Sequence, residues 1–330
     1  MKISIYIFLL LALPLLIGCE EHESYDRTAF FPTKEETPIT IPHKQNVWVF
    51  ILAGQSNMAG RAFVGPQDTI PNDRILTINS KNQLICAKEP LHFYEPDLAG
   101  LDCGLSFGYS LLKTIPENIT VLLLPTAVGG SSIAQWINDS YHRNVKLYAN
   151  FKDKITLGHE YGTIKGILWH HGENDATSSE TIEVYKEQLK ILFDLFRKDA
   201  DDLNLPILIG ELGSFSIVDT NVQAINRQIR EYVKTDQNAF LIKTDDLKDN
   251  GDEIHFDSEG QREMGKRFAY KFNYVHNINR IQIKCTLANT PSRNISQRPN
   301  FRLEGIERAG ELLTGGVFTD QEVYSRLKRD

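Results

Sequence analysis

The chain has 330 residues, of which 41% are hydrophobic, so it can bury a substantial core in one large domain or two small ones. Its formal net charge is −7 at pH 7, and its isoelectric point is near 5.8. Proteins that bind nucleic acids usually present a basic surface to the phosphates, so this balance argues against a nucleic-acid partner.

The N-terminal residues have the layout of a secretory signal. The sequence MKISIYIFLLLALPLLIGC has a lysine at position 2, a long apolar run, and small residues before Cys19. Residues 16–19 resemble a bacterial lipobox, in which the cysteine becomes the acylated first residue of the mature chain. This resemblance implies a lipoprotein signal peptide over residues 1–18, lipidation of Cys19, and a lipid-anchored place in the bacterial cell envelope, periplasmic or at the cell surface. A plain signal peptide with an incidental cysteine is the alternative.

The cysteines do not form a disulfide framework. Without Cys19, three remain at Cys86, Cys103 and Cys285, which is an odd number. Cys86 and Cys103 have two interpretations, a disulfide formed outside the cytoplasm or two buried thiols. No CxxC pair or other spacing typical of zinc ligands occurs, and we predict neither a metal nor another cofactor.

Residues 19–45 are polar and contain prolines, so we expect a tether between the anchor and the fold. Apolar runs of strand length then alternate with amphipathic helical patterns as far as residue 276. Continuous apolar runs are typical of parallel strands buried on both faces. The alternation predicts a doubly wound α/β sheet, whose ligand site lies beyond the carboxyl ends of the strands. The predicted strands are 47–53, 119–125, 164–169, 206–210 and 239–242, and the predicted helices include 182–196, 222–232 and 264–272.

Beyond residue 276 the alternation fades. The final segment, FRLEGIERAGELLTGGVFTDQEVYSRLKRD, predicts two short helices joined at Gly315 and Gly316. Thr319 and Glu322 have the spacing of a capping box that would begin the second helix. We therefore treat residues 277–330 as a C-terminal extension ending in a helical hairpin, which resembles the small SHOCT-type hairpins of bacterial proteins.

A candidate nucleophile follows the first predicted strand. In ILAGQSNMAG, residues 51–60, Ser56 would stand at the carboxyl edge of the sheet, either as a nucleophile or as a helix cap. A serine nucleophile needs a base and a group that orients the base. In NGDEIHFDSEGQREMG, residues 250–265, Asp252 can meet Nδ1 of His255 and leave Nε2 for Ser56. Asp257 is the competing carboxylate.

Two further polar segments follow predicted strands. In WHHGENDA, residues 169–176, the side chains of His171 and Asn174 are candidates to stabilise an oxyanion. In TAVGGSSIAQW, residues 126–136, Gly129 and Gly130 would let backbone N–H groups approach a substrate closely. Trp136, together with Tyr94 upstream, is either a stacking surface for a sugar ring or part of the core.

These four segments resemble, in order and spacing, the sequence blocks of the SGNH hydrolases. They resemble more closely the carbohydrate esterases that include sialate O-acetylesterases and acetylxylan esterases, with a SASA-type domain. The resemblance extends over about residues 47–272, and we assign residues 46–276 to this domain. It implies a three-layer α/β/α, flavodoxin-like fold and metal-free hydrolysis of acetyl esters on carbohydrates, either sialic acid or xylan-type glycans.

Carried over by motif, the resemblance makes Ser56 the nucleophile, His255 the general base and then acid, and Asp252 its orienting partner. The N–H groups of Ser56 and of Gly129 or Gly130 would help to form the oxyanion hole. The candidate substrate-binding residues are Gln55, Asn57, Trp136 and Glu173.

The third block departs from the family pattern Trp-x-Gln-Gly-Glu-x-Asp, because His171 occupies the glutamine position. Residues 172–175 also fit the Gly-x-Asn-Asp form of the wider SGNH group, so we favour Asn174 as the side-chain oxyanion donor and place His171 second. Glu173 and Asp175 are expected to hold the loop. The altered block leaves one rival function, a non-catalytic glycan-binding lipoprotein with an esterase fold. Intact Ser56, Asp252 and His255 count against it.

Overall fold

The computed structural model describes residues 26–215, 220–276, 280–286, 302–313 and 317–327, the last three ranges by their backbone alone. A seven-stranded sheet with the strand order β3-β2-β4-β1-β7-β8-β9 forms its centre. All neighbouring strands run parallel except β2 and β3. The strands are β1 (Val47–Gly54), β2 (Ile75–Ile78), β3 (Leu84–Cys86), β4 (Thr120–Pro125), β7 (Thr163–His170), β8 (Ile207–Gly210) and β9 (Ala239–Ile242).

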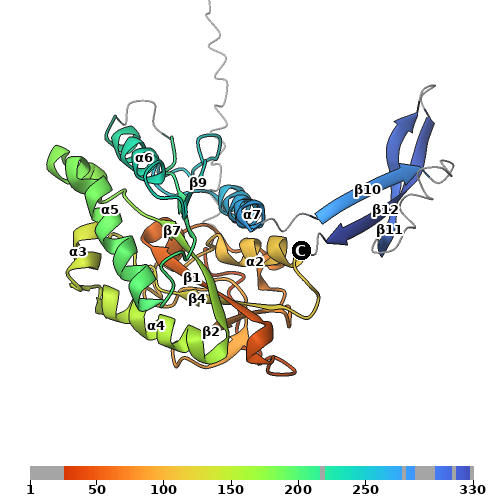
Figure 1. Cartoon of the computed structure of the whole chain (residues 1–330), viewed down its shortest axis with the longest axis horizontal. Helices are drawn as coiled ribbons and strands as arrows, with labels where there is room; N and C mark the ends of the chain where they lie inside the picture. Colours follow the sequence, from red (N-terminus) through yellow and green to blue (C-terminus); the bar gives the residue numbers. More distant parts are fainter. Residues whose placement is uncertain (1–25, 216–219, 277–279, 287–301, 314–316, 328–330) are drawn as a thin grey trace, which may run out of the picture.

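Helices cover both faces of this sheet (Figure 1). One face carries α2 (Gly104–Leu112) and α7 (Ser258–Val275), and the other carries α3 (Ile133–Ile137), α4 (Leu147–Tyr161), α5 (Ser179–Asp199) and α6 (Thr220–Val233). Shorter elements are α1 (Ser56–Ala59), the 3₁₀ turns Lys44–Asn46, Pro66–Thr69 and Asp175–Thr177, and the hairpin β5 (Tyr141–His142) and β6 (Val145–Lys146). The predicted three-layer α/β/α fold is confirmed.

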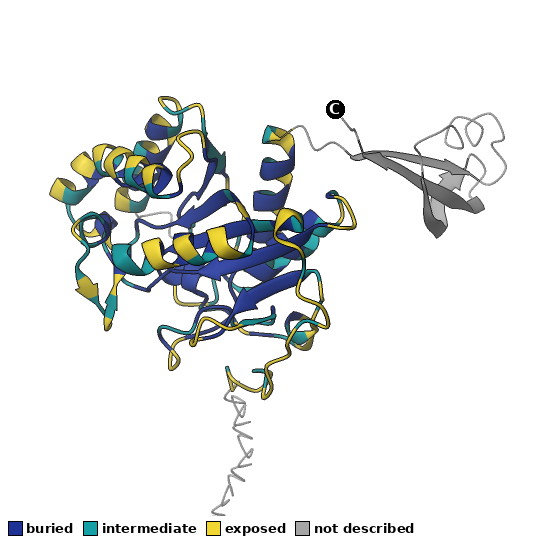
Figure 2. Ribbon diagram, turned by 60° about the horizontal axis from the view of Figure 1, so that its bottom comes forward, coloured by how far each residue is buried: buried dark blue, intermediate teal, exposed yellow. Residues whose placement is uncertain are grey.

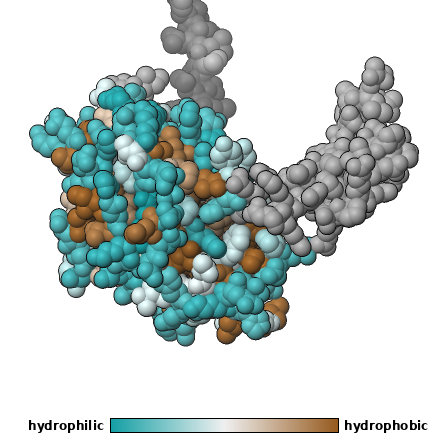
Figure 3. Space-filling model, in the orientation of Figure 1, coloured by the Kyte–Doolittle hydropathy of each residue, from teal (hydrophilic) through white to brown (hydrophobic). Residues whose placement is uncertain are grey.

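The central strand shows why its sequence is apolar throughout. Val49, Ile51 and Ala53 of β1 belong to the core under α3–α6, whereas Phe50 and Leu52 belong to the core under α2 and α7. Successive side chains of a strand point to opposite faces, so a strand covered on both sides has no polar face. Figure 2 shows the strands buried between helices whose outward sides are exposed, and the face drawn in Figure 3 is mainly hydrophilic.

The prediction of a tether is wrong for residues 26–45, because this segment packs on the domain. Phe31 packs against the small cluster of Ala62, Val64 and Leu101, and the N–H of Cys86 in β3 donates to the carbonyl of Glu36 at 2.7 Å. The polar composition of this segment gave no indication that Phe31 packs on the domain, or that its backbone forms a hydrogen bond with the edge strand of the sheet. Residues 1–25, with Cys19 and the predicted signal peptide, lie outside the described residues.

The helical hairpin predicted near the C-terminus is also wrong. Strands β10 (Arg280–Thr286), β11 (Arg302–Leu313) and β12 (Val317–Leu327) form a separate antiparallel sheet in the order β10-β12-β11. Gly305 and Gly310 lie inside β11, and glycine disfavours a helix interior by about 1 kcal/mol relative to alanine. Ile281 and Ile283 alternate with polar residues in β10, a period of two that indicates a strand.

The alternative of two buried thiols is the one that the structure shows for Cys86 and Cys103. Burial raises the pKa of both thiols, so neither is an activated nucleophile. Within the described part of the chain, no helix is both long and apolar enough to span a membrane.

Candidate active site

The end of β1 places Ser56 at the carboxyl edge of the sheet. Gly54 has a φ of +140°, and a Cβ there would lie only 2.0 Å from the carbonyl oxygen of His170 on the neighbouring β7. The N–H of Gln55 donates to that same oxygen at 3.0 Å, after which the chain turns into α1. Glycine is therefore required where the two strands come together, and the turn presents Ser56 beyond them.

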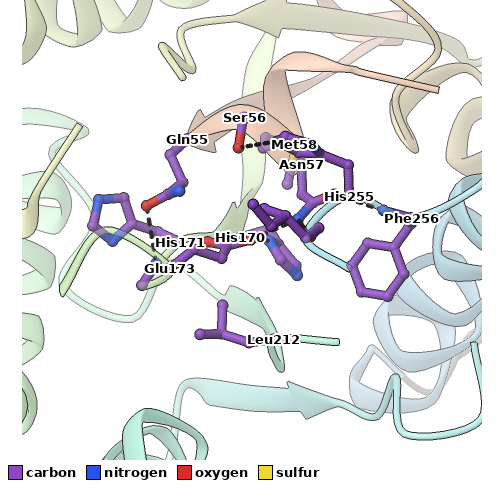
Figure 4. A network of polar contacts seen from close by, with 12 residues as sticks. Gln55, Ser56, Asn57, Met58, His170, His171, Glu173, Leu212, His255 and Phe256 are labelled. Carbon is purple, nitrogen blue, oxygen red and sulfur yellow. Dashed lines mark hydrogen bonds and ion pairs between the residues drawn. The ribbon is translucent and has the colours of Figure 1, made fainter. Parts of the chain in front are cut away.

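The structure brings the three predicted catalytic side chains together. Nε2 of His255 lies 3.0 Å from Oγ of Ser56 (Figure 4). Nδ1 of the same ring lies 2.6 Å from Oδ2 of Asp252. Asp252 also accepts the N–H groups of Ile254 at 2.9 Å and His255 at 2.7 Å. Partial burial by itself would raise the pKa of Asp252, but these hydrogen bonds and the imidazole outweigh it and lower that pKa. An ionised Asp252 holds the imidazole with Nε2 facing the serine.

The competing carboxylate, Asp257, has a different role. Its Oδ1 accepts the N–H of Gly260 at 2.6 Å, so it caps the N-terminus of α7. Asp252 is thus the carboxylate that contacts His255.

Asn57 and Glu173 were predicted to bind substrate, but they join the loops of the site to one another. Asn57 is fully buried; its amide donates to Oε1 of Glu173 at 2.6 Å and to the carbonyl of Ile254 at 3.1 Å. Its Oδ1 accepts the N–H of Phe256 at 3.0 Å. Figure 4 shows Asn57 and Phe256 on either side of His255 in this network. The contacts fix the loop that carries His255 against the turn that carries Ser56.

Gln55 links the Ser56 turn to the third loop and also lines the cleft. Its Oε1 accepts the N–H groups of Gly172 and Asn174, each at 3.3 Å. Because Oε1 is occupied in this way, its amide nitrogen is the group left to face a substrate. Gln55 therefore lies on the wall of the cleft beside Ser56, and its role in substrate binding stays a prediction.

The predicted oxyanion donors separate into two groups. The N–H of Gly129 donates to Oε2 of Glu95 at 2.5 Å, so it is not directed at a substrate. Gly130 lines the cleft with a φ of +72°, and no described residue accepts its N–H. Asn174 is exposed and lines the same cleft. The donors that remain are the N–H groups of Ser56 and Gly130 and the side-chain amide of Asn174.

The prediction of His171 as an oxyanion donor is wrong. The side chain is fully buried; its ring stacks on Trp169 with centroids 4.9 Å apart, and Nδ1 lies 3.1 Å from the hydroxyl of Tyr185 on α5. Burial lowers the pKa of His171 to about 3, so the ring is neutral. It lies in the core beneath the loop and does not line the cleft.

The two aromatic candidates for sugar stacking are not available either. Trp136 is fully buried, packs edge-on against Trp169, and donates from Nε1 to Oγ of Ser131 at 3.0 Å. The hydroxyl of Tyr94 donates to the carbonyl of Pro125 at 2.8 Å, and Tyr94 does not line the cleft. Both side chains belong to the packing beneath the site, which is the alternative interpretation of their aromatic character.

Above the serine is an open cleft of about 470 Å³. It is lined by Arg27, Gln55, Ser56, Arg61, Leu98, Gly129, Gly130, Arg143, Asn174, Asn250, Asp252, Ile254 and His255. Within the described residues, no group of three or more His, Cys, Asp or Glu side chains is placed to hold a metal ion.

Three arginines of the cleft had no signal in the sequence. Arg61 and Arg143 both pair with the buried carboxylate of Glu95, Arg61 at 2.9 Å. Burial would raise the pKa of Glu95, but Arg61, the N–H of Gly129 and Arg143 together lower it, so it is ionised. Arg61 lies just after GQSNMAG, but Arg143 lies 13 positions after Gly130, outside the quoted motifs. No residue spacing in the sequence predicts that such arginines come together.

The chain is similar in sequence to known carbohydrate esterases. The family model for carbohydrate esterases, sialic acid-specific acetylesterase, matches residues 46–274. A probable carbohydrate esterase of Arabidopsis thaliana is 28% identical over 260 residues, which cover 72% of this chain and 94% of that protein.

Solved structures share the fold. The structure of that plant protein superposes with a TM-score of 0.62 at 24% identity, covering 70% of this chain and 98% of its own. NanS superposes with a TM-score of 0.59 at 17% identity, covering 73% and 100%. A carbohydrate acetylesterase from Xanthomonas citri superposes with a TM-score of 0.53 at 16% identity, covering 85% and 72%.

Proposed function

Because the chain belongs to the carbohydrate esterase family of sialic acid-specific acetylesterases, we propose that it is a serine esterase that removes O-acetyl groups from carbohydrates through an acetyl-enzyme. The observation that carries the proposal is the continuous line of contacts from Asp252 through His255 to Ser56, at 2.6 and 3.0 Å. A pure binding module would have no need of this arrangement.

In the first half of the reaction, Oγ of Ser56 attacks the acetyl carbonyl while Nε2 of His255 takes the hydroxyl proton. The negative charge that develops on the carbonyl oxygen is stabilised by the N–H groups of Ser56 and Gly130 and by Asn174. One such donor typically lowers the activation free energy by about 3 to 4 kcal/mol. The intermediate then collapses, and His255 returns the proton to the departing sugar oxygen.

In the second half, His255 takes a proton from water, which attacks the acetyl-enzyme. The second tetrahedral intermediate releases acetate, and the proton on His255 returns to Oγ of Ser56. Atoms balance over the two halves: one ester and one water give one alcohol and one acetic acid. Asp252 stabilises the imidazolium that forms in each half.

The charge of the cleft favours an acidic sugar over a neutral xylan-type chain. Arg27, Arg61 and Arg143 line it, whereas the facing carboxylates are those of Glu95 beneath and Asp252 beside the serine. Asp252 is engaged by His255, which leaves an excess of positive charge. Guanidinium groups bind carboxylates with two parallel hydrogen bonds, so we favour O-acetylated sialic acid as the substrate.

The lipid anchor remains part of the proposal. The lipobox-like residues 16–19 support acylation of Cys19 and a place in the bacterial cell envelope, with the membrane contacted through lipid only.

The test is the variant Ser56→Ala, assayed with 4-nitrophenyl acetate, acetylated sialic acid and acetylated xylan. Turnover should fall by several orders of magnitude on every substrate, because no other described hydroxyl lies within reach of His255. Circular dichroism should show an unchanged fold. Near-normal acetate release by the variant would contradict the assignment of Ser56 as the nucleophile. Folded wild-type protein that binds acetylated glycans without hydrolysing them would favour the binding module.

A further inference from the structure

The segment before the family domain reaches the cleft. The family match begins at residue 46, yet Arg27 lines the cleft together with Ser56 and His255. Arg27 therefore belongs to the site in space although it lies outside the domain in sequence.

Specific contacts hold this segment on the domain. Phe31 packs against Ala62 and Leu101, which pair with each other in an isolated β-bridge. Further along, Oε2 of Glu35 accepts the side-chain amide of Asn79 at 2.8 Å, and the carbonyl of Lys34 accepts Nζ of Lys88 at 2.8 Å. These contacts come from apolar, polar and charged groups at once, so the segment has one defined position.

A short turn sets the direction of Arg27. The carboxylate of Asp26 accepts the N–H of Thr28 at 2.9 Å and its hydroxyl at 2.8 Å. The guanidinium of Arg27 lies 5.8 Å from the ring centroid of Phe31 and donates through Nη2 to the carbonyl of Asp97 at 2.6 Å. The packing of Phe31 and the position of Arg27 are therefore linked.

Arg27 differs from the other two arginines of the cleft in its partners. Arg61 and Arg143 share the carboxylate of Glu95, which neutralises part of their charge. Arg27 pairs with no carboxylate among the described residues, and its Nη1 is buried without an acceptor there. A buried donor without an acceptor is unfavourable, and a carboxylate would satisfy both the hydrogen bond and the charge.

We propose that Arg27 is a specificity-determining residue, which binds the carboxylate of an acidic sugar whose acetyl ester lies at Ser56. Arg61 and Arg143 add to the positive field, while the docked segment supplies the guanidinium that is free to make the contact. The proposal rests on the proposed function, and it makes the segment between the predicted anchor and the domain a part of substrate recognition.

The experiment measures kcat/KM for acetate release from O-acetylated sialic acid and from the derivative whose carboxylate is converted to a carboxamide. The full-length protein in detergent solution is compared with Arg27→Gln. The wild type should prefer the acid, and Arg27→Gln should reduce that preference by about tenfold or more, because one charge-assisted contact is lost. The matched control is Arg227→Gln on α6, since Arg227 is exposed and does not line the cleft.

A second variant tests the docked segment itself. Phe31→Ala keeps Arg27 but removes its support, so the preference for the acid should fall as well. An unchanged preference in Arg27→Gln, or a wild type that does not distinguish the two substrates, would overturn the proposal. Hydrolysis of 4-nitrophenyl acetate that depends on Ser56 tests the proposed function separately, so the two failures can be told apart.

Discussion

Two residues beneath the site, His171 and Asp175, form a buried contact between uncharged groups. Nδ1 of His171 lies 3.6 Å from Oδ2 of Asp175. Burial lowers the pKa of His171 to about 3 and raises the pKa of Asp175 to about 7. Between these values both side chains are neutral, so the contact is not an ion pair in that range. Asp175 also accepts the N–H of Ile133, which ties the loop after β7 to the start of α3.

The free energy of unfolding should depend on pH because of this pair. The raised pKa of Asp175 determines that it falls as the pH rises. The pKa of Asp175 is about 7 in the folded chain, against an ordinary value of 3.8, so the folded state binds an extra proton between those limits. The stabilisation by Asp175 is complete below 3.8 and is lost as pH rises to about 7. In Asp175→Asn, which keeps an acceptor for Ile133, this loss should be absent.

Urea unfolding of both proteins between pH 4 and 8 checks this prediction. The free energy of unfolding of the wild type, relative to Asp175→Asn, should fall over that range by up to about 4 kcal/mol. His171 is common to both proteins, so its own titration largely cancels. A difference that stays flat or rises with pH would contradict the neutral pair.

At the scale of elements, one side chain joins the turn after β1 to the loop before α7. The amide of Asn57 donates to Glu173 and Ile254, and its oxygen accepts from Phe256. Asn57→Asp keeps the shape but replaces the donor by a charged oxygen facing Glu173. We expect a loss of about 2 to 4 kcal/mol in the free energy of unfolding, because a buried charge is left unpaired.

The same variant should lose activity, since Ile254 and Phe256 flank His255. Urea unfolding and acetate release measure the two effects. Asn204→Asp is the matched control, because Asn204 is exposed and its side-chain oxygen only accepts a hydrogen bond from Asn238. The control should stay within about 0.5 kcal/mol of the wild type. Equal stability of Asn57→Asp and wild type would show that the loops are held together by other contacts.

Elements buried on both faces were the most predictable from sequence. The continuous apolar runs of β1, β4, β7, β8 and β9 gave boundaries close to those observed, because burial on two faces leaves no room for polar residues. The short strand β2 and its neighbour β3, at the edge of the sheet, were not predicted. At the C-terminus, the capping-box spacing of Thr319 and Glu322 favoured a helix, although the glycines within β11 opposed a helical hairpin.

The residues of the site likewise divide into those that were predictable from the sequence and those that were not. Ser56, Asp252 and His255 were predictable because they lie in short sequence motifs. In addition, a serine nucleophile requires a base and a group that orients the base. The burial of His171 was not, since it depends on the contact with Tyr185 of α5. For Trp136, a place in the core was one of the two interpretations that the sequence left open. The arginines of the cleft were missed for a similar reason: Glu95, which orders two of them, comes from a loop without any motif.

At the scale of the whole molecule, the predicted anchor and the cleft are close along the chain. Arg27 lies only eight positions after Cys19. A fully extended chain spans at most about 3.6 Å per residue, so acylation of Cys19 would hold Arg27 within about 30 Å of the membrane. Such an enzyme would act on glycans near the surface to which it is attached.

Replacement of Cys19 tests this arrangement. Cys19→Ala should move the protein from the membrane fraction to the soluble fraction of the expressing bacterium, because the acylation site is lost. Hydrolysis of 4-nitrophenyl acetate should persist, since the substitution leaves every described residue of the cleft unchanged. Membrane association that survives the substitution would contradict a lipid anchor at this cysteine. Incorporation of labelled palmitate into wild type and variant is the accompanying control.

The most direct measurement is the site of covalent labelling by a fluorophosphonate, which reacts with activated serines. Full-length protein is treated until acetate release from an acetylated carbohydrate stops, and the labelled peptide is identified by mass spectrometry. We expect one adduct, on Ser56, that accumulates in proportion to the activity lost. Activity that persists after Ser56 is fully labelled, or inactivation with the label on another residue, would contradict Ser56 as the nucleophile.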